Sequence, residues 1–274
     1  MIDNIIKQSM TEDVLISSEI ASSMHNPLNI KIYDEIDSTN RQMKDNIRKG
    51  EAACPDLIIA GCQTAGRGRL GRKFESPQGT GIYMTYKIDP DKAASNPILI
   101  TSAAAVAVAG AVRQIGFDAS IKWVNDIYVN SKKVCGILAE SVCNPDGNRY
   151  IVLGIGINYS TGKDSFSDEV KNIAGSLYEM DDNNRLPAGA VTRNRLIALV
   201  MDNFIDICKN IDSRQFMKQY RDWSMVLKKN IRYQKNGIWT DGIAVEIDDN
   251  GALIVETEAG RVLLNTGEIS LRLK

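Results

Sequence analysis

The feature that most constrains the fold is a set of three glycines that follows a short apolar stretch. Gly66, Gly68 and Gly71 have the spacing of the dinucleotide-binding fingerprint G-x-G-x-x-G, and the apolar residues before them predict a buried strand. In a Rossmann fold such a loop opens a helix at once, whereas here Pro77 and Gly79 stand where that helix would run. The sequence therefore excludes a Rossmann nucleotide site and leaves a glycine-rich loop with some other role.

Basic side chains alternate with the glycines of this loop. Arg67, Arg69, Arg72 and Lys73 place four positive charges within a few residues of one another. Glycine lets the backbone approach a ligand closely, and guanidinium groups bind phosphate and carboxylate oxygens through paired hydrogen bonds. The loop is therefore a candidate site for an anionic ligand. The alternatives are a solvated basic loop and a contact with nucleic acid.

Charge and composition exclude several kinds of chemistry. The 274 residues carry a formal net charge of −1, which argues against a dedicated binder of nucleic acid or membrane surfaces. The single histidine, His25, excludes multi-histidine metal sites, and its polar, turn-like surroundings predict a surface position. Five cysteines without C-x-x-C spacing indicate a reducing, cytoplasmic compartment. The N-terminus has no signal-peptide pattern, and the longest apolar run, 97–112, predicts a buried helix rather than a membrane span.

Hydrophobic periodicity predicts a mixed order of strands and helices. We expect strands at residues 30–36, 57–62, 82–88, 121–129, 134–142 and 150–157, and helices at 39–49, 98–115, 168–179, 191–208 and 213–227. From residue 231 the strand pattern returns, and residues 248–251 predict a hairpin turn in a small all-β unit. The expected division is an appendage at 1–29, a main domain at 30–227 and the β unit at 228–274.

Two further stretches place polar residues or glycines among apolar ones. Lys122, Asn125 and Asp126 lie in an apolar segment, which suggests partly buried polar groups that need partners or a ligand. Exposed residues on a strand edge would give the same pattern. Gly154 and Gly156 interrupt an apolar strand, which indicates close approach by a ligand or tight packing against another backbone.

Read together, these motifs resemble those of the biotin protein ligases, which attach biotin to a lysine of a carrier protein. The resemblance covers about residues 30–274 and depends on five motifs in order, at 37–40, 66–72, 122–126, 133–140 and 154–158. It implies an α+β fold with a mixed sheet and helices, like the catalytic domain of class II aminoacyl-tRNA synthetases. It also implies a small Src-homology-3-like β-barrel from about residue 228, which residues 267–272 fit.

The resemblance further implies which residues bind the substrates. Those of the biotin site would be Ser38, Thr39, Asn40, Gln63, Arg67, Gly68, Arg69, Lys133, Gly136, Gly154 and Gly156. Those of the ATP and adenylate site would be Arg67, Arg69, Arg72, Phe74, Lys122, Asn125, Asn158 and Arg272. The catalytic candidates are Lys133, Arg69 in a closing loop, and Asp126 toward the incoming lysine. Phe74 and Val124 depart from the family, which often has Trp and Pro there, although both residues are apolar.

The implied reaction uses ATP and biotin as substrates, with Mg²⁺, to form biotinyl-5′-adenylate and then biotinylate a carrier. The expected partner is the biotin carboxyl carrier domain of acetyl-CoA carboxylase or a related carboxylase. No metal site formed by the protein is expected, and neither is binding to DNA or to a membrane. Whether the chain forms a homodimer is left open. Some relatives carry an N-terminal winged-helix DNA-binding domain, which residues 1–29 cannot supply, so repressor activity is not predicted. The alternatives are a lipoate–protein ligase, whose arginine motif ending in a run of glycines is absent, and a non-catalytic biotin-sensing regulator.

Overall fold

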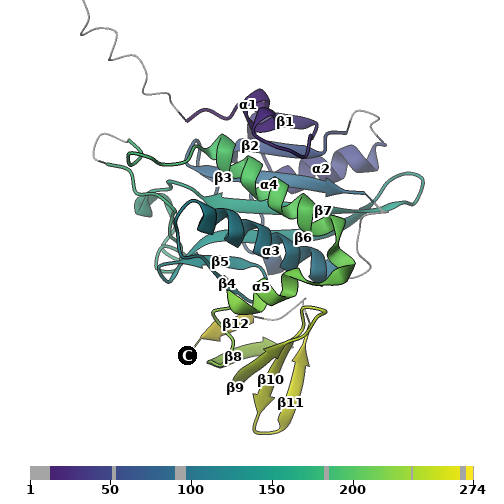
Figure 1. Cartoon of the computed structure of the whole chain (residues 1–274), viewed down its shortest axis with the longest axis vertical. Helices are drawn as coiled ribbons and strands as arrows, with labels where there is room; N and C mark the ends of the chain where they lie inside the picture. The colour runs from purple at the N-terminus through teal and green to yellow at the C-terminus, as the bar shows by residue number, and fades with distance from the viewer. Residues whose placement is uncertain are drawn as a thin grey trace, which may run out of the picture.

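The protein combines a seven-stranded mixed sheet with a smaller five-stranded antiparallel sheet (Figure 1). The computed structural model describes residues 13–50, 54–89, 97–181, 185–235, 237–265 and 270–273, with residues 97 and 270–273 described by their backbone. The strands of the larger sheet are β1 Ile30–Ile36, β2 Leu57–Gln63, β3 Gly81–Ile88, β4 Ser120–Lys122, β5 Asp126–Val129, β6 Lys132–Cys143 and β7 Arg149–Asn158. Their spatial order is β1-β2-β3-β7-β6-β5-β4. β1 and β2 pair in parallel, and the other pairs are antiparallel.

Helices cover both faces of the larger sheet. They are α1 Ser17–Ser22, α2 Thr39–Arg48, α3 Pro97–Gln114, α4 Arg193–Lys209 and α5 Phe216–Asp222, with short 3-10 turns at Arg69–Gly71, Lys163–Ser165 and Ile211–Ser213. Because side chains alternate along a strand, β2 directs Ile58 to one face and Ile59 to the other. Ile58 packs with Met43 and Ile47 of α2, whereas Ile59 belongs to the core under α3 and α4. The sheet is therefore enclosed between α2 and the α3–α4 pair (Figure 1).

The smaller sheet lies at the end of the molecule next to α5 and β4 (Figure 1). Its strands are β8 Asn230–Lys235, β9 Ile238–Ile247, β10 Leu253–Thr257, β11 Gly260–Leu264 and β12 Ser270–Leu273, in the order β11-β10-β9-β8-β12. Trp123 Nε1 donates to the carbonyl of Gly251 at 3.0 Å, which joins this sheet to the turn between β4 and β5. The predicted α+β architecture with a small β unit at the C-terminal end is confirmed.

Residues 13–29 pack against α4. Ile20 of α1 is fully buried in the main core, and Asp13 forms an ion pair with Arg193 at 2.9 Å. His25 keeps 61% of its side chain exposed, as its polar surroundings predict, while its ring nitrogens lie 3.0 Å from Asp202 and 2.8 Å from Asp206. The segment is thus part of the folded body where the structure describes it.

Three predicted elements differ from the structure. The helix predicted at 168–179 is wrong: the stretch forms turns, and its backbone groups bond to Lys133, whose N–H donates to Ile173 O at 2.8 Å and whose carbonyl accepts from Gly175 N at 2.9 Å. The single strand predicted at 121–129 is two strands separated by a turn. The helix predicted at 213–227 is the shorter α5. None of the described helices has the length and hydrophobicity needed to cross a bilayer.

Candidate active site

Three glycines lie close together on the face of the sheet that α2 covers, and the space left by their missing side chains, which Asn40 and Phe74 enter, is called the hollow below. Gly136 of β6 pairs with Gly156 of β7, and Gly154 lies two residues away on the same strand face. A Cβ on Gly154 would stand 2.2 Å from Oδ1 of Asn40, and one on Gly156 would stand 2.5 Å from the ring of Phe74. These glycines therefore admit two side chains of the predicted site, which explains why they interrupt an apolar strand.

The glycine- and arginine-rich loop folds as a tight hairpin beside this hollow. The N–H of Gly68 donates to the carbonyl of Arg72 at 2.7 Å, and the N–H of Phe74 donates to Gly66 O at 3.0 Å. A Cβ on Gly66 would stand 2.4 Å from the carbonyl oxygen of Phe74, so the two sides of the hairpin meet only if this residue is glycine. The hairpin carries the Phe74 ring over Gly156 and within 6.4 Å of the Tyr83 ring, edge to face.

Arg69 reaches from this loop to the turn between β4 and β5. Its Nη1 donates to Oδ1 of Asn125 at 3.0 Å, and Asn125 Nδ2 donates to the carbonyl of Ile137 at 2.6 Å. Burial lowers the pKa of Arg69, while the nearby carboxylate of Asp126 acts in the opposite direction. Behind the turn, the hydroxyl of Tyr220 donates to Val124 O at 2.9 Å. A buried amide and a buried hydroxyl thus fix the place to which the guanidinium is brought.

Lys133 stands on the other side of the same turn. Its Nζ lies 2.7 Å from Oδ1 of Asp126, and both side chains are largely buried, with 29% and 22% exposed. Asp126 pairs with Gly136 across β5 and β6, so the ion pair lies at the edge of the glycine hollow. The turn therefore brings two cations, Arg69 and Lys133, to one carboxylate and one amide. Such an arrangement can neutralise a phosphate group.

The other end of the hollow is lined by polar groups of α2 and β2. The N–H of Thr39 donates to Oε1 of Gln63 at 2.9 Å, and the Thr39 hydroxyl oxygen lies 3.1 Å from the same atom. Gln63 Nε2 donates to the hydroxyl of Ser76 at 2.9 Å. Asn40 Nδ2 donates to Glu140 Oε2 at 2.9 Å. Ser38, which is buried, precedes α2, and its carbonyl accepts from Gln42 N at 2.9 Å. Apart from the Glu140 carboxylate, which stands behind Asn40, these donors and acceptors are neutral and suit an uncharged polar ring system.

The remaining predicted residues lie on the hairpin, on β4 and β7, and on β12 of the smaller sheet. Arg67 and Arg72 are exposed on the hairpin, next to Gly68. Lys122 Nζ lies 5.5 Å from the centre of the Tyr128 ring. Asn158 is buried and donates to Gly175 O at 3.0 Å, behind the backbone of Lys133. Arg272 belongs to β12, but its side chain is outside the described residues. The substrate roles of all these residues remain predictions.

Several residues that support the site were not singled out from the sequence. They are Lys44, Ser76, Thr85, Trp123, Glu140 and Tyr220. Each comes from a different element and touches the site only after folding, so its spacing in the sequence carries no signal. Trp123 and Glu140 are partial exceptions because each lies within one of the five motifs, although nothing in those motifs indicates their partners.

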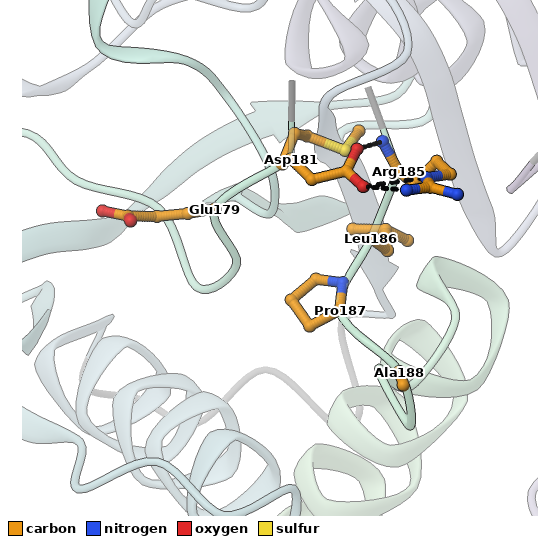
Figure 2. Close-up of a pocket in the computed structure, with 7 residues that line it drawn as sticks. Glu179, Asp181, Arg185, Leu186, Pro187 and Ala188 are labelled. Atoms are coloured by element: carbon orange, nitrogen blue, oxygen red, sulfur yellow. Dashed lines mark hydrogen bonds and ion pairs between the residues drawn. The ribbon is translucent and has the colours of Figure 1, made fainter. Parts of the chain in front are cut away.

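A second hollow, of about 570 Å³, lies elsewhere on the surface and contains none of the predicted site residues (Figure 2). Its lining residues are Glu179, Met180, Asp181, Arg185, Leu186, Pro187 and Ala188. Arg185 donates to Asp181 through its backbone N–H and Nε, both at 2.8 Å, which ties the two ends of the hollow together. Among the described residues, no group of three or more His, Cys, Asp and Glu side chains is arranged to hold a metal ion.

Comparison with known proteins identifies the family. Residues 33–158 match the Biotin/lipoate A/B protein ligase family, and residues 229–272 match the Biotin protein ligase C terminal domain. The chain is 32% identical over 250 residues to the bifunctional ligase/repressor BirA of Bacillus spizizenii, covering 88% of this chain and 73% of that relative. It is 25% identical to the biotin–[acetyl-CoA-carboxylase] ligase of Mycobacterium tuberculosis, covering 88% of both chains.

A solved structure shares the fold. The biotin protein ligase from Aquifex aeolicus in complex with biotin and ATP superimposes with a TM-score of 0.72 at 26% identity, covering 90% of this chain and 99% of that one. Both family matches, the relatives and the fold agree with the motifs and with the site that they form. The chain belongs to the Biotin/lipoate A/B protein ligase family, among its biotin protein ligases.

Proposed function

We propose that the chain is an ATP-dependent ligase that forms biotinyl-5′-adenylate and transfers the biotinyl group to a lysine of a carrier protein. The observation that carries the proposal is the convergence of Arg69 and Lys133 on the Asn125–Asp126 turn, at the edge of a hollow lined by neutral polar groups. The fold in which this occurs is that of a ligase solved with biotin and ATP. One end of the site suits a phosphate and the other an uncharged ring.

The first step needs no nucleophile from the protein. A carboxylate oxygen of biotin attacks the α-phosphorus of ATP, the new C–O–P linkage forms, and the bond to pyrophosphate breaks. The protein must align the two substrates and neutralise the charge on the phosphates. Lys133 and Arg69 supply that charge from opposite sides of the turn. Mg²⁺ would enter with the phosphates of ATP and, because this ion keeps several waters, would need few carboxylates from the protein.

The second step transfers the acyl group. The amine of the carrier lysine attacks the carbonyl carbon of the mixed anhydride, the bond to the phosphate oxygen breaks, and AMP leaves. The attacking amine must lose a proton, and Asp126 is the carboxylate next to the phosphate end of the site, so we assign that role to it. Phe74 and the hairpin cover the hollow, which would shield the anhydride from water.

We infer the remaining features from the same reading. The proposed substrate residues are those predicted from the sequence, and the proposed acceptor is a biotin carboxyl carrier domain. The proposed units are residues 30–227 for catalysis and 228–274 for the β unit, with residues 1–29 as an appendage whose residues 13–29 pack against α4. All five cysteines are free thiols, which supports a cytoplasmic location. These assignments concern the binding partners and boundaries rather than the reaction itself.

A transfer assay tests the proposed function and its nearest rival. Purified protein is incubated with ATP, Mg²⁺ and a biotin carboxyl carrier domain, with either biotin or lipoate, and the carrier is examined by intact-mass spectrometry. We expect the carrier lysine to gain one biotinyl group and no lipoyl group. Lipoyl transfer without biotinyl transfer would favour the lipoate ligase. Binding of biotin without any transfer would favour the non-catalytic regulator.

A further inference from the structure

Lys44 and Glu140 form an ion pair directly behind Asn40. Lys44 Nζ lies 2.7 Å from Oε1 of Glu140, and Asn40 Nδ2 donates to the other oxygen, Oε2, at 2.9 Å. The pair joins α2 to β6, and the side chains of Lys44 and Glu140 are 13% and 28% exposed. Each carboxylate oxygen therefore has a different donor, and the carboxylate cannot turn without losing both contacts.

The opposite side of the Asn40 amide faces a buried hydroxyl. Thr85, which is fully buried, has its Oγ1 at 2.6 Å from Oδ1 of Asn40 and at 2.8 Å from Oγ1 of Thr39. Oδ1 carries no hydrogen, so the hydrogen in the shorter contact must come from Thr85. If the amide were turned over, its oxygen would face the Glu140 carboxylate, and two acceptors would meet at 2.9 Å. The network thus allows one orientation of the amide.

The ionised Glu140 makes the shorter of the two contacts that select this orientation, since Asn40 Nδ2 also donates to the Leu138 carbonyl at 3.4 Å. Burial raises the pKa of Glu140, but hydrogen bonds from Lys44 and Asn40 and the charge of Arg67 outweigh it, so that the pKa lies below its ordinary value. The group is then ionised at neutral pH and can only accept hydrogen bonds. A glutamine in place of Glu140 would have an NH₂ group on one side and an oxygen on the other. Lys44, which can only donate, would hold the oxygen and leave the NH₂ group facing Asn40.

The Asn40 amide is connected to the rest of the polar end of the hollow. Because the one hydroxyl hydrogen of Thr85 goes to Asn40, the Thr39 hydroxyl donates to Thr85 at 2.8 Å, and the Thr39 backbone N–H donates to Gln63 Oε1 at 2.9 Å. Gln63 in turn donates to Ser76 Oγ at 2.9 Å, and this hydroxyl donates to the carbonyl of Phe74 at 3.1 Å. Turning over the Asn40 amide would make Thr85 accept from it and would reverse the two hydroxyl contacts as far as Thr39, whereas the Thr39 N–H would still donate to Gln63.

We propose that Glu140, oriented by Lys44, is a positioning residue that locks the Asn40 amide and thereby sets the hydrogen-bonding pattern presented to biotin. This inference rests on the proposed function, because the fixed orientation of the Asn40 amide affects biotin only if the hollow binds biotin. Lys44 and Glu140 themselves stand behind Asn40, on the side where the amide donates. Their effect on the substrate is therefore indirect.

The test is the variant Glu140→Gln alone and combined with Lys44→Met. In Glu140→Gln, the ammonium of Lys44 attracts the new carbonyl oxygen, the new NH₂ faces Asn40 Nδ2, and the Asn40 amide turns over. We expect KM for biotin in ATP–pyrophosphate exchange to rise by about tenfold, with KM for ATP within about twofold, since one polar contact is reversed. Removing Lys44 as well lets the glutamine turn its oxygen to Asn40, so the double variant should recover most of the lost affinity.

A matched control lies on the same helix. Asp45→Asn breaks the exposed Asp45–Arg48 ion pair, at 3.2 Å, without touching the network, and KM for biotin should stay within about twofold of wild type. A role limited to holding α2 against β6 would make the double variant no better than the single one. That result, or an unchanged KM for biotin in Glu140→Gln, would overturn the inference.

A second readout does not depend on catalysis. In the ligand-free, ¹⁵N-labelled protein, the side-chain amide signal of Asn40, assigned by its loss in Asn40→Asp, should shift in Glu140→Gln and return toward its original position in the double variant. An unchanged signal would overturn the inference. Failure of the proposed function would instead show as wild-type protein without biotin-dependent exchange.

Discussion

Lys133 is the single residue on which adenylate formation should depend most. It supplies a positive charge at the phosphate end of the site, where Asp126 holds its ammonium at 2.7 Å. Removing a charge that acts on the transition state costs about 2–4 kcal/mol. We therefore expect Lys133→Ala to slow biotin-dependent ATP–pyrophosphate exchange by about 30-fold to 1,000-fold.

The neighbouring lysine provides the control. Lys132 points out of the sheet and donates to the carbonyl of Asn172 at 2.7 Å, away from the site. Lys132→Ala should leave the exchange rate within about twofold of wild type, since exposed polar contacts contribute little. Normal exchange in Lys133→Ala would rule out the assignment of Lys133.

The hairpin loop is the element that should retain the intermediate. Arg69 is one of its contacts with the body of the protein, through Asn125 at 3.0 Å. Losing one charge-assisted contact to the adenylate should cost about 2–4 kcal/mol, so Arg69→Ala should release biotinyl-adenylate faster. Release is measured by chasing labelled adenylate from the enzyme, with Arg261→Ala on the exposed edge of β11 as the control. Equal release rates for wild type and Arg69→Ala would contradict the role of the loop.

The contact between residues 13–29 and α4 should stabilise the fold at neutral pH and weaken as the pH falls. The hydrogen bond from Lys209 lowers the pKa of Asp206 to about 2 against the opposing effect of burial, with smaller lowering contributions from His25 and Asn26. The unfolded-state pKa is about 3.9, so the folded state holds the ionised form more strongly. The stabilisation is complete above about pH 4 and is lost as the pH falls toward 2.

Asp206→Asn removes this dependence. The difference in free energy of unfolding between wild type and Asp206→Asn, from urea titrations, should be constant from pH 7 to about pH 5 and should shrink as the pH falls below about 4. A difference that stays constant down to pH 2.5 would contradict the assigned cause of the shift.

Elements with a strong local pattern were predictable, and elements shaped by distant contacts were not. The apolar run at 97–112 is helical as predicted, with residues 99–109 buried in the core, and α2 follows Ser38 as expected. The stretch at 168–179 has apolar residues at helical spacing, yet its backbone bonds to Lys133, 40 residues earlier in the chain. The break in the strand at 121–129 lies where Tyr220 and Gly251 hold the turn from behind. No local window contains those partners.

At the scale of the whole molecule, the smaller sheet should help to hold the catalytic turn in place. Trp123 Nε1 donates to Gly251 O, and this contact lies two residues from Asn125. Trp123→Phe keeps the aromatic packing but leaves the buried carbonyl without this donor, which should cost about 1–3 kcal/mol of stability. We expect a lower melting temperature together with a raised KM for ATP. A lower melting temperature with unchanged kinetics would show that the contact is structural alone.

The whole site could be anticipated only in part. The motifs led to the right family, and Arg69, Asn125, Asp126 and Lys133 lie together in the structure as that resemblance implies. What the motifs could not reveal is how the residues pair, because that depends on the register of β5, β6 and β7. The same register brings Gly154 against the side chain of Asn40 and Gly156 against the ring of Phe74, where a Cβ on either glycine would collide with them.

The central claim is that this chain itself activates biotin as an adenylate. The most direct measurement is biotin-dependent exchange of labelled pyrophosphate into ATP by the purified protein, with no carrier present. We predict exchange that requires biotin, is not supported by lipoate and is lost in Lys133→Ala. Exchange that proceeds equally well without biotin, or no exchange from a folded protein supplied with biotin, ATP and Mg²⁺, would contradict it.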